Sequence, residues 1–98
     1  MKKFGEKIFI LCKQIPRGKV STYKKIAEAI DNPKAFRAVG NILNKNKLLV
    51  KVPCHRVVRS DGSVGGYVCG QDKKIDLLKK EGIEVKNKKI DLDKYLFE

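Results

Sequence analysis

Two proline-containing breaks divide the first 45 residues into three short segments, each of a length that suits one helix. The first break is Pro16-Arg17-Gly18 and the second is Asp31-Asn32-Pro33. Proline lacks an amide hydrogen, and glycine and asparagine tolerate turn conformations, so a helix ends at each break. The apolar spacing therefore predicts helices over about residues 3–14, 22–30 and 34–45.

The second and third segments have the pattern of a helix-turn-helix unit over about residues 22–46. Ser21 or Thr22 can cap the first helix of the pair. The second helix is basic and carries small residues, and its predicted buried stripe consists of Phe36, Val39, Gly40 and Leu43. Many helix pairs share this pattern, so taken alone it is weak support for DNA binding.

Short β-prone runs and one further helix follow Asn46. The runs at 48–52 and 57–58 are apolar, and the sequence at 60–63 favours a turn. A last helix is predicted over 71–81, ending at Gly82, and the tail beyond it resembles a small hairpin whose last residues pack on the core. A chain of 98 residues suits one domain. We therefore expect a single, mainly α, winged-helix-like domain with short β-hairpin elements.

Positive charge is concentrated in the middle of the chain. The net charge is +12, and residues 13–59 hold twelve Lys or Arg residues against only Glu28 and Asp31. A basic block of this kind attracts a polyanion and binds phosphates in a salt-sensitive way. A solvated lysine-rich surface, as in AT-rich or heat-loving organisms, would have the same composition. Charge alone leaves these two interpretations equally open.

The cysteines and the single histidine do not have the spacing of a metal site. Cys12, Cys54 and Cys69 match no zinc pattern, so we expect neither a metal nor another cofactor. No apolar run approaches the ~18–20 residues of a membrane span, and a signal-peptide pattern is not recognisable. These features predict reduced thiols in a cytoplasmic protein.

Cys54 and His55 form a candidate nucleophile and base. A cysteine thiol has an ordinary pKa of about 8.5 and reacts as the thiolate, so a neighbouring imidazole would activate it. A carboxylate behind the imidazole would fix its tautomer, and Glu81 at the end of the last helix is an attractive choice. A buried structural cysteine beside an incidental histidine is the alternative that the pair alone favours.

A series of motifs resembles the O6-alkylguanine-DNA alkyltransferases (methylated-DNA–protein-cysteine methyltransferases), in particular their C-terminal catalytic and DNA-binding domain. The resemblance covers about residues 4–82, and its block around Cys54 reverses the preference for a structural cysteine. The matching motifs are Ile15-Pro16-Arg17-Gly18, Ser21-Thr22-Tyr23, Asn32-Pro33-Lys34-Ala35, Arg37-Ala38-Val39-Gly40, Asn46, Val52-Pro53-Cys54-His55-Arg56-Val57-Val58, Gly62, Gly65-Gly66-Tyr67, and Leu77-Leu78 through Glu81.

The resemblance implies a chemistry for four residues. Cys54 would take the alkyl group from guanine O6 as a thioether, so each molecule would act once. His55 would accept the thiol proton through a water, and Glu81 would orient the imidazole. Asn46 would join the helix-turn-helix to an active-site loop over about residues 52–70, and residues 83–98 would form a C-terminal tail.

The resemblance also implies substrate and DNA contacts. Tyr23 would assist the departure of guanine as a catalytic group, and Arg37 would replace an extruded nucleotide in the stack of double-stranded DNA. The O6-alkylguanine would lie against Val57, Tyr67, Val68 and Lys74. The expected DNA contacts, with the recognition helix in the minor groove, are Arg37, Thr22, Tyr23, Ala35, Ala38, Gly40, Asn41, Lys34 and Lys45.

With the resemblance, we expect a monomeric, nucleoid-associated protein of a prokaryote or archaeon that transfers alkyl groups. Three alternatives stand beside this expectation. An alkyltransferase-like protein would recognise the lesion and recruit other repair factors, but such relatives typically carry tryptophan in place of Cys54. A helix-turn-helix regulator would leave the Pro-Cys-His-Arg block unexplained, and a thiol hydrolase would lack an evident oxyanion site. The chain departs from its relatives at Val68, where serine is common, and at Cys69, where glycine is common. We expect no counterpart of the N-terminal domain that many relatives carry ahead of the position of Phe4.

Overall fold

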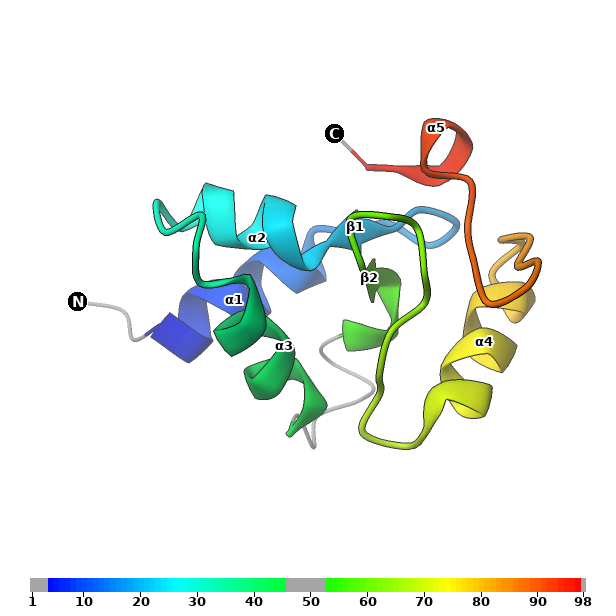
Figure 1. Ribbon diagram of the computed structural model, residues 1–98, viewed down its shortest axis with the longest axis horizontal. Helices are drawn as coiled ribbons and strands as arrows, with labels where there is room; N and C mark the ends of the chain where they lie inside the picture. Colours follow the sequence, from blue (N-terminus) through cyan, green and yellow to red (C-terminus); the bar gives the residue numbers. More distant parts are fainter. Residues whose placement is uncertain (1–3, 46–52, 98) are drawn as a thin grey trace.

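Three helices from the first half of the chain lie on one side of a short two-stranded sheet, and a fourth long helix lies on the other side (Figure 1). The computed structural model describes residues 4–45 and 53–97. In chain order the elements are α1 Phe4–Lys13, β1 Ser21–Thr22, α2 Tyr23–Ala29, α3 Phe36–Asn44, the 3-10 turn η1 Cys54–Arg56, β2 Val57–Val58, α4 Gln71–Lys80 and α5 Leu92–Tyr95. A mainly helical domain with short strands is thus confirmed.

Helices α1, α2 and α3 form where the apolar spacing predicted them, with the two proline-containing breaks between them. Thr22 caps α2, because its Oγ1 accepts a hydrogen bond from the Lys25 amide at 3.0 Å. The helices share one buried cluster with the later turn and strand. Its members are Ile8, Cys12, Ile15, Ile26, Ala27, Val39, Leu43, Cys54 and Val57.

Two positions of the predicted α3 stripe are not buried as expected. Val39 and Leu43 are buried, whereas Phe36 is 45% exposed, Gly40 is half-buried, and both line an open groove. Phe36 is the first residue of α3. Helical spacing identifies the face that carries apolar side chains, but it does not say whether another element covers that face along its whole length.

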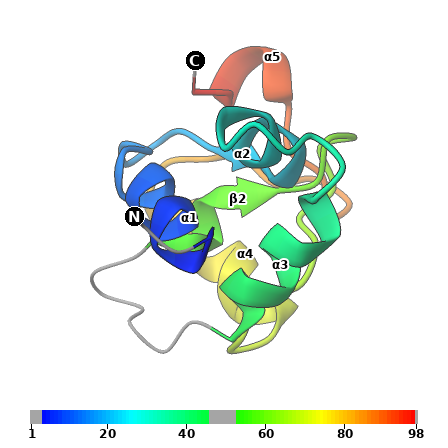
Figure 2. The ribbon, with the colours of Figure 1, turned by 90° about the vertical axis from the view of Figure 1, so that its left-hand side faces the viewer.

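The two short strands pair in parallel, with Ser21 opposite Val57 and Thr22 opposite Val58. Parallel strands need a crossover connection, so this pair is not one of the expected β-hairpins. Figure 1 places β2 between the α1–α3 group and α4, and Figure 2 shows α2 and α4 on opposite sides of β2. Because β2 begins directly after η1, the pairing holds the Cys54 turn against the start of α2.

The second half of the chain packs around its own buried cluster. As predicted, α4 stops ahead of Gly82: its last residue is Lys80, Glu81 is the cap, and Gly82 has the left-handed φ of 87° that ends a helix. The tail contains a minimal hairpin in which Lys86 and Lys89 exchange two backbone hydrogen bonds, and Val20 bridges to Leu96, so the chain end returns to the core. The cluster consists of Val20, Val58, Val64, Leu78, Ile83, Ile90 and Tyr95.

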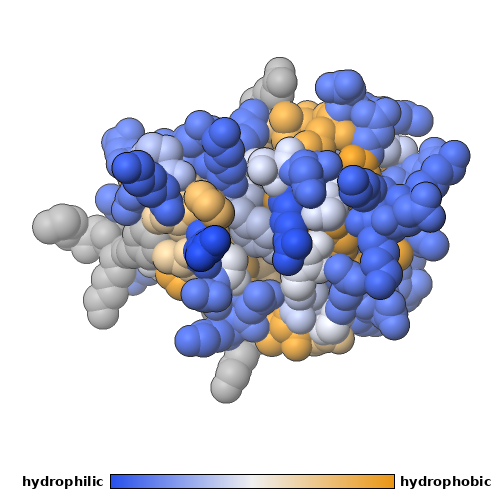
Figure 3. Space-filling view, viewed as in Figure 1, coloured by the Kyte–Doolittle hydropathy of each residue, from blue (hydrophilic) through white to orange (hydrophobic). Residues whose placement is uncertain are grey.

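One face of the molecule is largely hydrophilic. Hydrophilic residues cover most of the face in Figure 3, with smaller apolar patches between them. Within residues 4–45 and 53–97, no helix has the length and apolar character needed to cross a membrane.

Gly62→Ala is expected to lower the free energy of unfolding by about 3 kcal/mol. Gly62 has a φ of 89°, and a Cβ there would lie 2.6 Å from the backbone oxygen of Ile90. Gly70→Ala is the matched control, because Gly70 has a φ of 95° but open space around its Cβ position. Urea unfolding should give a loss of only about 1 kcal/mol for the control. Equal losses for both variants would contradict the close contact with Ile90.

Candidate active site

Cys54 lies in a buried turn and belongs to the buried cluster that it shares with α1, α2 and α3. It opens η1 directly after Pro53, and only 3% of its surface is exposed. The next residue, His55, is 7% exposed, and its ring lies edge-on to the Tyr67 ring with centroids 6.5 Å apart. A thiol and an imidazole thus occupy consecutive positions in a nearly dry setting.

Glu81 reaches this turn from the end of α4 and joins it to Arg56. One of its oxygens, Oε1, lies 3.1 Å from His55 Nε2, an ion-pair distance without the alignment of a hydrogen bond. Arg56 donates to both carboxylate oxygens, from Nε at 2.9 Å and from Nη2 at 2.6 Å. A third hydrogen bond from Arg56 goes to the Ile15 carbonyl at 2.8 Å. The carboxylate is therefore fixed in place beside the imidazole.

The electrostatics keep His55 neutral and Glu81 ionised at neutral pH. Burial lowers the pKa of His55, and the contact with Glu81 only partly opposes this. Burial would raise the pKa of Glu81, but the hydrogen bonds from Arg56 and the contact with His55 outweigh it and bring the pKa below 4.5. The carboxylate beside Nε2 favours the tautomer that carries its proton on that nitrogen, and Nδ1 of the neutral imidazole can then accept another proton.

Lys74 is a fully buried lysine that connects α4 to Tyr23. Its Nζ donates to the Tyr23 hydroxyl at 3.2 Å and to the Gly66 carbonyl at 3.0 Å. Burial lowers the pKa of Lys74 to about 7, with the Cys54 side chain opposing this and Arg59 adding to it. Burial raises the pKa of Tyr23 to about 12, although Arg59 opposes that shift. Tyr23 therefore remains a neutral hydroxyl beside a lysine that titrates near neutrality.

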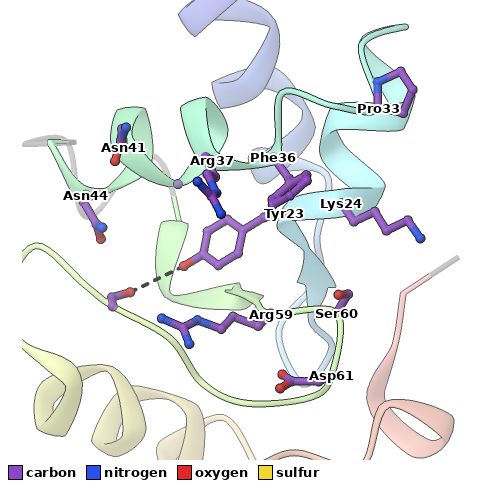
Figure 4. A pocket seen from close by; sticks show the side chains of 12 residues that line it. Tyr23, Lys24, Pro33, Phe36, Arg37, Asn41, Asn44, Arg59, Ser60 and Asp61 are labelled. Carbon is purple, nitrogen blue, oxygen red and sulfur yellow. Dashed lines mark hydrogen bonds between the residues drawn. The ribbon is translucent and has the colours of Figure 1, made fainter.

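A groove of about 850 Å³ opens beside Tyr23, between the α2–α3 pair and the segment after β2 (Figure 4). Arg37 and Phe36 project into it from α3, and Arg59 extends beneath the Tyr23 hydroxyl from the opposite side (Figure 4). Tyr23 also packs against the buried cluster that contains Cys54. The lining residues are Tyr23, Lys24, Pro33, Phe36, Arg37, Gly40, Asn41, Asn44, Arg59, Ser60, Asp61 and Gly66.

The structure brings many of the sequence-predicted residues to these two places. Cys54, His55 and Glu81 meet at the turn, while Lys74 donates a hydrogen bond to Tyr23 at the groove. Buried Val57 follows the turn, and Tyr67 and the exposed Val68 lie on the loop ahead of α4. Of the DNA-contact residues, the groove takes Tyr23, Arg37, Gly40 and Asn41.

Other predicted residues lie apart from the groove or outside the described chain. The side-chain oxygen of Thr22 is buried and engaged as the α2 cap. Asn46 lies outside the described residues, as does position 52 at the start of the predicted active-site loop. Near the end of α3, Asn44 approaches the loop, since a Cβ at Gly66 would lie 3.4 Å from its Nδ2. Four further residues are not among those that line the groove: Lys34, Ala35, Ala38 and Lys45.

Sequence reasoning gave no role to two arginines. Arg56 holds Glu81, and Arg59 lies across the groove from Arg37. Arg56 stands directly after His55 inside the Pro-Cys-His-Arg block, so its position was available as a signal. Arg59 had no comparable signal, because a single arginine after a strand is ordinary in a basic chain.

Comparison with known proteins identifies the family. The family described as "6-O-methylguanine DNA methyltransferase, DNA binding domain" matches residues 3–83. A bifunctional methyltransferase/endonuclease of Picrophilus torridus is 46% identical over 90 residues, covering 92% of this chain and 30% of the relative. A methylated-DNA–protein-cysteine methyltransferase of Methanosarcina acetivorans is 46% identical over 80 residues, covering 82% of this chain and 51% of the relative.

Solved structures give the same relationship. S. pombe Atl1, in complex with damaged DNA containing O6-carboxymethylguanine, superposes with a TM-score of 0.90 at 31% identity, covering 100% of this chain and 99% of Atl1. Mycobacterium tuberculosis OGT, in complex with DNA, gives a TM-score of 0.77 at 36% identity, covering 83% of this chain and 50% of OGT. The chain thus spans from under a third to about half of the length of the methyltransferases named here. It belongs to the 6-O-methylguanine DNA methyltransferase family, as a chain that contains the DNA binding domain.

Proposed function

We propose that this chain repairs DNA by transferring an alkyl group from O6-alkylguanine to its own Cys54. The observation that carries the proposal is the buried turn in which Cys54 precedes a histidine held next to an Arg56-bound Glu81 carboxylate. The family match over residues 3–83 includes all of these residues. Relatives named methylated-DNA–protein-cysteine methyltransferases support the same reaction class.

In the proposed reaction His55 takes the proton of the Cys54 thiol, and the sulfur attacks the alkyl carbon. A carbon–sulfur bond forms, the bond from that carbon to guanine O6 breaks, and its electron pair stays on the guanine. The neutral state of His55 favours the first step, and the fixed carboxylate stabilises the imidazolium that results. Because a thioether has no easy reverse reaction, each chain acts once.

Negative charge develops on the guanine as the alkyl carbon departs, and Tyr23 is proposed to stabilise it. Its neutral hydroxyl can donate toward the ring, and the hydrogen bond from Lys74 makes that hydroxyl a stronger donor. The loop from Gly66 to Val68 is proposed to hold the base, with a backbone amide toward O6. The departing guanine anion takes up one proton and the His55 imidazolium releases one to solvent. In the net reaction the alkyl group therefore replaces the thiol proton, and the guanine leaves as a neutral base.

The groove is proposed as the binding site of the DNA duplex. Helices α2 and α3, joined by the break at residues 31–33, would act as a helix-turn-helix over about residues 22–46, with α3 in the minor groove. Lys24, Arg37 and Arg59 give this groove positive charge suited to phosphates. The proposed domain is the whole chain, with an active-site loop at 52–70 and a tail at 83–98.

A label-transfer experiment tests this function. The chain is mixed with duplex DNA in which one O6-methylguanine carries a tritiated methyl group. We expect the label to move to the protein until one methyl group is bound per chain. Label that stays in the DNA while the protein binds the duplex would overturn the proposal.

Arg37→Ala is expected to slow transfer from duplex DNA by about tenfold or more while leaving transfer from the free base O6-methylguanine unchanged. Only the duplex requires an extruded nucleotide, which costs a few kcal/mol that the inserted arginine would offset. Single-turnover rates on the two substrates measure the difference. Lys7→Ala is the control, because it removes an exposed positive charge on α1 that does not line the groove. Equal slowing on both substrates would remove Arg37 from this role.

Lesion recognition without transfer is the second candidate. The superposition with Atl1 over nearly its whole length favours it, since that protein is similarly short and was solved with damaged DNA. The cysteine at position 54 favours transfer. The label experiment separates the two, because recognition alone leaves the methyl group on the guanine.

A further inference from the structure

Phe36 is a large apolar side chain on a surface where charge would be expected. Among the described residues the exposed large apolar side chains are Ile10 at 36%, Val68 at 40% and Phe36 at 45%. Phe36 alone of these three lines the groove. Moving an aromatic ring out of water lowers the free energy of the system. The exposure of this ring in a groove therefore indicates a ligand that covers it.

The neighbours of Phe36 indicate the chemistry of that ligand. Figure 4 shows the ring pointing from α3 toward Tyr23, with Arg37 on one side and Lys24 on the other. Arg59 lines the opposite wall. Cations that can meet phosphates beside an aromatic face that can meet a base are the combination that nucleic acids require. A second copy of this chain would bring the same +12 charge into the groove, so charge disfavours self-association there.

We propose that Phe36 is an apolar wedge that packs against the base step beside the extruded nucleotide. This inference rests on the proposed function, because it presumes a duplex in the groove and a nucleotide taken out of it. Consecutive residues of a helix point about 100° apart, so Phe36 and Arg37 cannot enter the same gap in the stack. Arg37 fills the vacated position, and Phe36 holds the adjacent step open. Minor-groove proteins use phenylalanine in this way.

The test compares Phe36→Ala with the unchanged chain on a duplex that carries O6-methylguanine beside 2-aminopurine. The fluorescence of 2-aminopurine rises when its stacking is lost. We expect Phe36→Ala to bind this duplex about tenfold more weakly, because stacking of one base on an aromatic ring contributes roughly this factor to affinity. We also expect it to lose most of the fluorescence rise. Phe36→Tyr, which keeps the ring, should restore both signals, and Phe36→Leu should restore them only in part.

Two controls make the result specific. Ile10→Ala removes an exposed apolar side chain outside the groove and should leave binding and fluorescence unchanged. The slope of binding against salt should also stay the same in Phe36→Ala, because no phosphate contact is lost. Circular dichroism checks that each variant is folded.

Three outcomes would overturn the wedge. These are binding and fluorescence in Phe36→Ala equal to those of the unchanged chain, a change of about one in the salt slope, or loss of a concentration-dependent dimer in Phe36→Ala. Failure of the proposed function would look different. In that case the unchanged chain takes no methyl group from duplex or free base, while the binding and fluorescence comparison still decides the role of Phe36.

Discussion

Cys54→Ser is expected to abolish alkyl uptake while leaving the fold and duplex binding intact. A serine hydroxyl is far less acidic than a thiol, so His55 cannot convert it into an anion of comparable reactivity. The substitution replaces one atom of a residue whose surface is only 3% exposed, so little repacking follows. Single-turnover transfer of a labelled methyl group should fall by at least about a thousandfold. Binding of the lesion-containing duplex should stay within about twofold.

Cys69→Ser is the matched control for this loss. Cys69 is an exposed thiol on the loop ahead of α4, and it is not a member of the buried cluster that contains Cys54. Its replacement should leave the transfer rate unchanged. The reverse pattern, with uptake lost in Cys69→Ser and kept in Cys54→Ser, would show that Cys69 and not Cys54 accepts the alkyl group.

Glu81→Ala is expected to reduce both stability and reaction rate. The substitution leaves the Arg56 guanidinium, whose side chain is only 17% exposed, without the carboxylate that accepts two of its hydrogen bonds. Loss of one partner from such a pair should lower the free energy of unfolding by about 3 kcal/mol. His55 also loses the charge that orients it and stabilises its protonated form, so transfer should slow about a hundredfold. Urea unfolding and single-turnover kinetics measure the two effects.

Glu84→Ala provides the comparison for stability. Glu84 pairs with Lys86 at 3.2 Å, but these side chains are 57% and 82% exposed, so we expect a loss below about 0.5 kcal/mol.

The pKa of Glu81 in the folded protein is below 4.5, so its contribution is complete above about pH 4.5 and disappears as the pH falls through the lower folded value. The stability difference between Glu81→Ala and the unchanged chain should therefore vanish in acid. Equal stability of the two alanine variants at pH 7 would contradict the Arg56–Glu81 contact.

Local signals in the sequence were enough to predict helices α1 to α4, but not the short helix α5 in the tail. Proline-containing breaks fix where α1 and α2 end, and Gly82 fixes the end of α4, because these residues act through their own backbone preferences. The parallel pairing of β1 with β2 had no such signal. Each strand is two residues long, which is too short for a period, and the partners come from opposite sides of the α2–α3 pair.

The candidate site was predictable where a motif or a helix end marked the residue. Cys54 and His55 stand together in the chain, and Glu81 ends a helix, so the three could be named in advance. The partner of Arg56 was not predictable, because it lies 25 residues away and only the packing of α4 brings it close. Lys74 likewise belongs to a highly charged helix, and its full burial depends on Tyr23 and Gly66 from other elements.

Mass spectrometry of the chain after reaction with duplex O6-methylguanine, followed by mapping of its peptides, is the most direct test of alkyl transfer to Cys54. We predict that the intact protein gains one methyl group and that the modified peptide carries it on the sulfur of Cys54. An unmodified protein that still binds the lesion, or a methyl group on Cys12 or Cys69, would contradict the assignment.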